Sequence, residues 1–159
     1  MQGEPRATHD IDIVVEVLPG KIEAFLGEFS PNDYYYDIDS AKAAIKTGDM
    51  FNILSLTSGD RVDIWPLGTS AFDQSRFLRR QTVVLFDRAV KVSSSEDTIL
   101  MKLLWAKMSG GSDKQLYDAA RVYELQLDVL DESYIALWIE KLGLEKQCAN
   151  MGRFLDSNP

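Results

Sequence analysis

The sequence predicts an α/β chain of the α+β kind: a small mixed sheet with flanking helices, followed by a C-terminal helical bundle. Two observations predict it. Up to residue 93, short β-branched and aromatic runs alternate with turn signals and short helical patterns. From residue 94 onwards, apolar residues recur at the three- and four-residue spacing of buried helix faces. We therefore expect residues 1–93 to form an α/β core and residues 94–159 to pack on it, in one compact unit.

Composition narrows the class of protein. The 159 residues are 45% apolar, and 17 basic against 25 acidic side chains give a net charge of −8, which argues against broad non-specific nucleic-acid binding. No apolar run is long enough to cross a membrane, and no signal peptide is recognisable. The single cysteine, Cys148, cannot form an intramolecular disulfide. It suits a reducing compartment, so we expect a cytoplasmic protein.

The first 93 residues contain five expected strands and four helical or ambiguous segments. The strands are residues 11–17, 51–57, 61–65, 81–86 and 90–93. Residues 51–57 and 61–65 read as a hairpin because a short loop containing Gly59 joins them. Helical patterns cover residues 21–29 and 40–47, whereas residues 34–36 and 71–80 are ambiguous. Asp39 or Ser40 is the expected N-cap of the second helix, and Gly48 is its expected stop.

The helical region begins at a cluster of serines. Residues 93–96 offer an N-cap, with Glu96 as the reciprocal acid of a capping box. Ser112 with Gln115 is the expected cap of the next helix, and Asp131 that of the third. The expected buried faces are Ile99, Leu100, Leu103, Leu104 and Met108; then Leu116, Ala120, Tyr123 and Leu127; then Ile135, Trp138, Ile139 and Leu142. Residues 145–155 form a candidate fourth helix.

Two aspartates stand at the start of the first expected strand. Asp10 and Asp12 are two residues apart, so a strand places both carboxylates on one face, about 6.5 Å apart along the backbone. At an effective dielectric constant of about 20 their repulsion costs on the order of 2 to 3 kcal/mol. A hard divalent cation such as Mg²⁺ would offset that cost. The alternative is ordinary loop chemistry, because aspartates are common where strands begin.

A third aspartate favours the metal interpretation. In residues 61–65 the side chains of Val62 and Ile64 face one way, and those of Arg61, Asp63 and Trp65 face the other. Aspartate is depleted in mid-strand positions. A metal ion shared with a neighbouring strand would explain why Asp63 is there, and we expect the three aspartates to converge on one point.

The segment Arg6-x-Thr8-x-Asp10-Ile11-Asp12, together with Asp63, resembles the nucleotidyltransferase superfamily, which has a DNA polymerase beta-like fold. The likeness is closest to a small bacterial branch related to the AbiEii-type toxin nucleotidyltransferases. It covers residues 4 to about 144 and includes residues 90–100 and the segment 113–118, which resembles the family's basic-acidic helix start in altered form. The family's Gly-Ser helix before the first aspartate is absent. We expect either a truncated N-terminus or a degenerate member.

The resemblance implies Mg²⁺-dependent (or Mn²⁺-dependent) transfer of a nucleotidyl group from an NTP to an acceptor that is tRNA, a protein or a small molecule. Asp10, Asp12 and Asp63 would be the catalytic metal ligands. Arg6, Thr8, Lys102 and Asp118 would place the phosphates and the acceptor; for Lys102 and Asp118 the alternative is a solvated helix face.

The alternative function is a non-catalytic or degenerate module of the same fold that acts through a protein partner, as in toxin–antitoxin pairs. We also expect the absent helix to leave apolar surface beside the first strand. Self-association as a homodimer would cover that surface.

Overall fold

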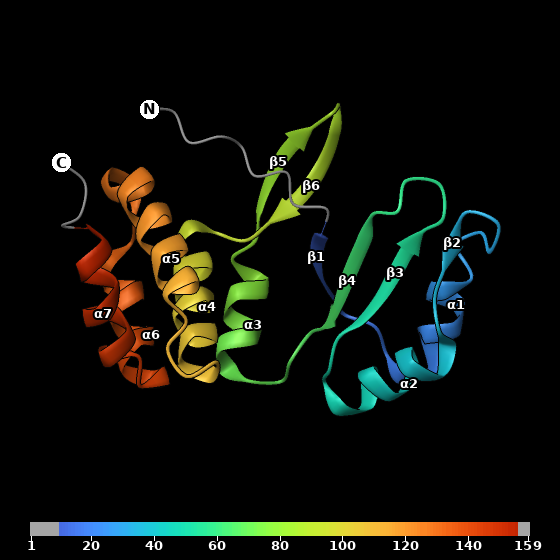
Figure 1. Cartoon of the computed structure of the whole chain (residues 1–159), viewed down its shortest axis with the longest axis horizontal. Helices are drawn as coiled ribbons and strands as arrows, with labels where there is room; N and C mark the ends of the chain where they lie inside the picture. Colours follow the sequence, from blue (N-terminus) through green and yellow to red (C-terminus); the bar gives the residue numbers. More distant parts are fainter. Residues whose placement is uncertain (1–9, 156–159) are drawn as a thin grey trace. The chain divides into compact units, whose positions relative to one another are not determined.

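The computed structural model describes residues 10–155, apart from the side chains of Asp10 and Pro19. It has the expected mixed α+β architecture, with one four-stranded mixed sheet, one two-stranded sheet and a succession of helices (Figure 1). Contacts divide the chain into two compact units, one ending at Gln74 and the other beginning at Ser75. The sequence pattern changes from strand-rich to helical later than this boundary, at residue 93.

The first unit contains the four-stranded sheet. Its strands are β1 (Asp10–Val15), β2 (Tyr34–Tyr35), β3 (Phe51–Ser55) and β4 (Arg61–Pro66). Their spatial order is β1-β4-β3-β2. The expected β3–β4 hairpin is confirmed, because these strands pair antiparallel. Strand β4 also pairs in parallel with β1, so the strand that carries Asp63 is the neighbour of the first strand.

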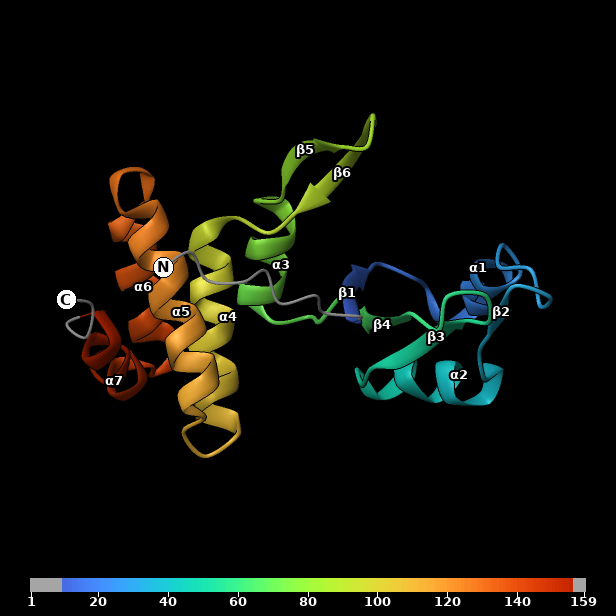
Figure 2. The ribbon, with the colours of Figure 1, turned by 45° about the horizontal axis from the view of Figure 1, so that its top comes forward.

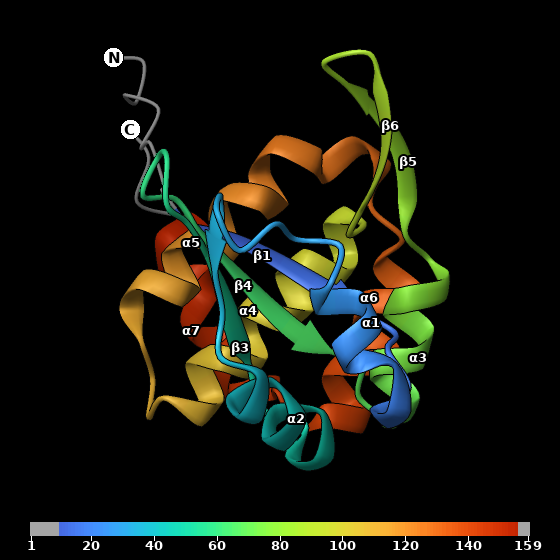
Figure 3. The same cartoon turned by 90° about the vertical axis from the view of Figure 1, so that its right-hand side faces the viewer.

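Two helices cover one face of this sheet. A short 3-10 turn, η1 (Pro19–Lys21), leads into α1 (Ile22–Leu26), and α2 (Ile38–Thr47) follows β2. Both helices lie on the same side of the sheet (Figure 3). The core between them and the strands consists of Ile22, Leu26, Ala41, Ala44, Phe51, Ile53 and Ile64. Helix α1 is shorter than the expected residues 21–29 because it ends at Gly27.

Helix α2 begins earlier than its sequence pattern indicates. Its N-cap is Asp37, whose Oδ1 accepts a hydrogen bond from the backbone amide of Ser40 at 2.6 Å. The assignment of Asp39 or Ser40 as the cap is therefore wrong, since both lie within the helix. The hydrogen bond from the Ser40 amide lowers the pKa of Asp37. The expected stop is confirmed: Gly48 has φ 78°, the left-handed conformation that glycine adopts most easily.

The apolar surface expected beside the first strand is present in part. Ile11 and Ile13 of β1 are exposed, although the register places them on the same face as the buried Ile64. Strand β1 lies at the edge of the four-stranded sheet that the structure describes. Self-association through this surface stays a prediction.

The second unit contains a hairpin and a group of helices. Helix α3 (Ala71–Leu78) spans the division between the units. It is followed by β5 (Gln81–Leu85), β6 (Arg88–Val92), α4 (Ser95–Met108), α5 (Asp113–Gln126), the 3-10 turn η2 (Leu127–Val129), α6 (Glu132–Leu142) and α7 (Glu145–Leu155). Among the described strands, β5 and β6 pair only with each other, and they project from the helices as a separate ribbon (Figure 2).

Helices α4 to α7 bury most of the expected faces. The buried apolar residues of this bundle include Ile99, Leu100, Leu103, Leu116, Ala120, Ile135 and Trp138, all expected from the periodicity. Met108 and Leu127 are exposed, so their assignment to the buried faces is wrong. Both lie at the C-terminal ends of their helical segments, where the apolar periodicity of the sequence continues although the side chain is not covered.

The helix caps match the sequence in part. Ser94 is the N-cap of α4, but its reciprocal acid is Asp97 and not Glu96. Ser112 stands at the N-cap of α5 without a side-chain capping hydrogen bond, which corrects that assignment. Asp131 caps α6 as expected, by accepting a hydrogen bond from the Tyr134 amide at 3.0 Å.

Within residues 10–155, none of the helices combines the length and the apolar character that a membrane crossing requires.

Candidate active site

The parallel pairing of β1 with β4 brings Asp12 and Asp63 together. Asp12 lies opposite Asp63 in the register, and Asp10 lies opposite Arg61. Partners in register project from the same face of a sheet, and neighbouring strands are about 4.8 Å apart. Ile64, the next residue on β4, belongs to the core under α1 and α2. Asp12 and Asp63 therefore lie on the opposite face of the sheet from those helices.

Asp63 is a nearly buried carboxylate with a basic neighbour on its own strand. Its exposed fraction is 7%. Arg61 Nη2 donates a hydrogen bond to Oδ2 of Asp63 at 3.0 Å, and Arg61 Nε lies 2.9 Å from Oδ1. The Oδ1 atom is buried but accepts no aligned hydrogen bond from the residues that the structure describes. A buried carboxylate needs a counter-charge, which Arg61 supplies, while Oδ1 keeps unused lone pairs.

Asp12 is exposed, and a tryptophan on the neighbouring strand orients it. Trp65 Nε1 donates a hydrogen bond to Asp12 Oδ1 at 3.0 Å. The two-residue period of the strand already places Trp65 on the face of Asp63, but its hydrogen bond to Asp12 depends on the pairing of β1 with β4. Asn52 of β3, opposite Asp63 in the antiparallel register, adds an exposed amide to the same face.

Other predicted residues of the site cannot be placed. Arg6 and Thr8 lie outside the described residues, and for Asp10 only the backbone in β1 is described. Two of the three predicted metal ligands, Asp12 and Asp63, thus lie directly opposite each other on the paired strands β1 and β4. The convergence of all three stays a prediction.

The carboxylate oxygens on this face of the sheet are suitable ligands for a hard divalent cation. Asp12 and Asp63 offer carboxylate oxygens, the ligands that Mg²⁺ and Mn²⁺ take, and Asp63 Oδ1 is a buried acceptor without an aligned donor. An ion bound there would compete with Arg61 for the Asp63 carboxylate. Among the side chains that the structure describes, no group of three or more histidine, cysteine or acidic residues is arranged to hold a metal ion.

Lys102 and Asp118, the predicted accessory residues, contact each other in the second unit. Lys102 Nζ of α4 lies 3.1 Å from Asp118 Oδ2 and 3.4 Å from Gln115 Oε1, both on α5. The contact joins two neighbouring helices, and both side chains are partly exposed. A role in placing phosphate or acceptor stays a prediction for this pair.

Sequence reasoning missed a buried polar network, also in the second unit. Asp97 is fully buried, with an exposed fraction of 0%. It accepts hydrogen bonds from Tyr134 Oη at 2.8 Å and from Ser94 Oγ at 2.9 Å. Arg79 lies over the Tyr134 ring, 3.8 Å from its centroid, and 3.3 Å from Glu96 Oε2. The signal in the sequence is the pair of acids at 96 and 97 where a helix begins, but their partners are distant along the chain.

The electrostatics of this network follow from burial and hydrogen bonding. Burial raises the pKa of Tyr134 to about 12, and the hydrogen bond to Asp97 adds to that effect. For Glu96, burial acts to raise the pKa, but hydrogen bonds from Ser94 and from the Asp131 amide, with the charge of Arg79, outweigh it and lower the pKa. The network connects the first turns of α4 and α6 to Arg79. Its role is therefore structural.

No protein-family model and no curated protein matches this chain. Kinship with the nucleotidyltransferases is therefore an expectation that rests on the motif residues.

Proposed function

We propose that this chain is a divalent-metal-dependent nucleotidyltransferase that transfers a nucleotidyl group from an NTP to a tRNA, protein or small-molecule acceptor. The observation that carries the proposal is the pairing of Asp12 with Asp63 on adjacent strands, on the sheet face opposite the helix-covered core. A mid-strand aspartate, buried and aligned with a second aspartate, is costly unless a cation or a proton is shared there.

The residues of this face have separable tasks in the proposed reaction. Asp10, Asp12 and Asp63 would hold Mg²⁺ or Mn²⁺, and the bound ion would neutralise triphosphate charge and stabilise the attacking and leaving oxygens. Asp63 Oδ1, which lies 2.9 Å from Arg61 Nε but accepts no aligned hydrogen bond, would accept the proton of the acceptor hydroxyl. Trp65 fixes the orientation of the Asp12 carboxylate through its hydrogen bond. Arg61 balances the charge of Asp63.

Metal binding and nucleotidyl transfer test the proposal together. Asp12→Asn and Asp63→Asn are compared with Asp33→Asn, which changes an exposed aspartate elsewhere in the first unit. We expect calorimetry to show Mg²⁺ or Mn²⁺ binding in the wild type and the control, and a loss of at least tenfold in affinity in the two site variants. Transfer from α-labelled NTPs to mixed RNA, to protein or to the chain itself should be lost with it. Equal metal binding in all four proteins would contradict the proposal.

The second candidate is a non-catalytic module of the same fold that acts through a protein partner. It is favoured by the observation that both carboxylates already have donors, Asp63 from Arg61 and Asp12 from Trp65. In that case Asp63→Asn would lower stability and weaken partner binding. Neither Mg²⁺ nor Mn²⁺ would change the melting temperature of the wild type.

A further inference from the structure

The hairpin of the second unit ends in an exposed apolar tip. Val84, Leu85 and Phe86 are all exposed, Phe86 to 98%. Phe86 and Asp87 form its two-residue turn with φ values of 48° and 61°. Such a turn needs positive φ at both positions, which suits Asn, Asp or Gly, whereas a bulky aromatic residue is disfavoured. Phe86 is therefore unfavourably placed in both conformation and solvation, and a contact made by its ring would explain why it is there.

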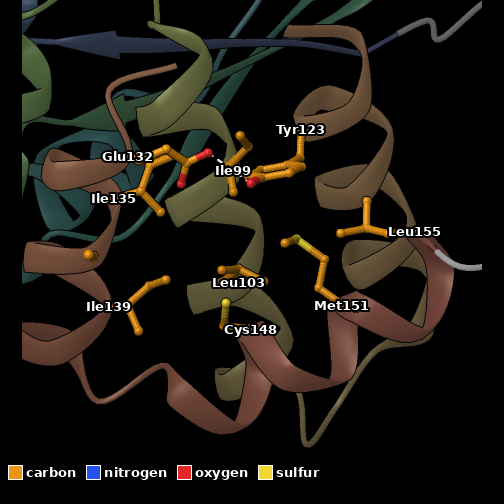
Figure 4. A pocket seen from close by; sticks show the side chains of 11 residues that line it. Ile99, Leu103, Tyr123, Glu132, Ile135, Ile139, Cys148, Met151 and Leu155 are labelled. Carbon is orange, nitrogen blue, oxygen red and sulfur yellow. Dashed lines mark hydrogen bonds between the residues drawn. The ribbon is translucent and has the colours of Figure 1, made fainter. Parts of the chain in front are cut away.

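The same unit contains a pocket that its own side chains leave unfilled. It has a volume of about 310 Å³ and lies among α4, α5, α6 and α7 (Figure 4). Its walls are mainly aliphatic, from residues such as Ile99, Leu103, Ile139 and Met151.

Three polar groups line the pocket: the Tyr123 hydroxyl, the Glu132 carboxylate and the Cys148 thiol. Tyr123 Oη donates a hydrogen bond to Glu132 Oε1 at 2.8 Å, drawn in Figure 4. The thiol of Cys148, the single cysteine, also lines it. Burial raises the pKa of this thiol, and the charge of Glu132 raises it further. The pocket is thus an apolar cavity with one carboxylate at its lining.

We propose that the hairpin tip of one copy of this chain inserts the Phe86 ring into this pocket of a second copy. The tip and the pocket are complementary in character, exposed apolar side chains against a cavity with apolar walls. In charge, Arg88 and Lys91 of β6 are opposite in sign to Glu132 at the pocket, whereas Asp87 in the turn itself is acidic. The tip points away from the helices that form the pocket of its own unit (Figures 1 and 2), so the contact joins two copies.

The proposed contact joins different surfaces on the two copies. If each copy both gives its tip and receives its partner's, two equal contacts close a twofold dimer. Aromatic residues that fill a pocket at the centre of an interface carry much of its binding energy. Phe86 occupies that position here.

Disulfide cross-linking can detect the contact between the hairpin tip and the pocket directly, because Cys148 is the only native thiol. Leu85→Cys adds a thiol beside Phe86 and keeps the ring. Mild oxidation with oxidised glutathione, at about pH 9 since the Cys148 pKa is raised, should give a disulfide-linked dimer. Adding Cys148→Ser or Phe86→Ala should abolish it, and Thr82→Cys, on the same hairpin but farther from the tip, should not give it. A cross-link that survives Cys148→Ser joins tip to tip and would overturn the proposal, as would no cross-link at all.

Sedimentation gives the second readout. Phe86→Ala should raise the dimer dissociation constant at least about thirtyfold, the effect of losing an aromatic anchor. Gly152→Phe should do the same by filling the pocket, since a Cβ at Gly152 meets no atom within 4 Å. Leu78→Ala, an exposed control on α3, should change nothing. An equimolar mixture of the Phe86→Ala and Gly152→Phe proteins retains one intact tip and one intact pocket, and should associate again. Association unaffected by either variant, or a mixture that stays monomeric, would refute the contact.

Discussion

Removing one hydroxyl from the buried network of the second unit is a sensitive test of its energetics. Tyr134→Phe deletes the donor to Asp97 Oδ1, a 2.8 Å hydrogen bond to a carboxylate with no exposure to solvent, and with it the 3.0 Å hydrogen bond between Tyr134 Oη and Ser75 Oγ. The substitution keeps the ring, and with it the stacking of Arg79 over that ring and the edge contact with Trp138. The measured change therefore reports the hydroxyl alone.

The expected loss is about 1.5 to 3 kcal/mol of unfolding free energy, the usual value for a hydrogen bond to a charged group. The matched control is Tyr123→Phe, which removes a hydroxyl that donates to the exposed Glu132 at the same distance, 2.8 Å. Water can replace that donor, so the control should lose less than about 1 kcal/mol. Urea unfolding followed by far-ultraviolet circular dichroism, with m-values compared between variants, measures both.

The pH dependence gives an independent check. The pKa of Tyr134 is raised to about 12 in the folded state, whereas a free tyrosine ionises near 10. Its stabilising contribution is therefore complete below pH 10 and is lost as the pH rises from about 10 to about 12. The stability difference between wild type and Tyr134→Phe should shrink across that range. Equal losses in the Tyr134 and Tyr123 variants, or a difference that does not depend on pH there, would refute the reasoning.

Three further predictions concern single positions. Asp12→Asn should leave the melting temperature in metal-free buffer unchanged or slightly higher, because repulsion from Asp63 is relieved; a clear fall would mean that the hydrogen bond from Trp65 needs the carboxylate. Gly48→Ala should lower the free energy of unfolding by about 1 kcal/mol because φ is 78° at this position. Gly152→Ala within α7 should raise it by up to about 1 kcal/mol, since the added Cβ meets open space. Urea unfolding that shows a change of the same sign in both variants would contradict this. Asp131→Ala should cost about 1 kcal/mol by removing the cap of α6, and Asp131→Asn should restore most of it in the same assay.

Sequence patterns determined the features that depend on neighbours along the chain. The two-residue period of β4 predicted that Val62 and Ile64 share one face and Asp63 the other, as the structure shows. Gly48 is recognisable as a helix stop because the left-handed conformation favours glycine. The helical periodicity predicted most of the buried bundle for the same local reason.

Tertiary structure decided every feature that joins distant residues. Asp12 lies beside Asp63 because β1 pairs in parallel with β4. No local sequence pattern specifies which strand pairs with β4. The hydrogen bond from Trp65 to Asp12 and the partners of Asp97 are also long-range, so propensity and spacing could not give them. The cap of α2 shows the same limit at short range. Three neighbouring polar residues could all act as caps, and only the backbone conformation at Asp37 selected one, because its extended φ and ψ let the carboxylate reach the Ser40 amide.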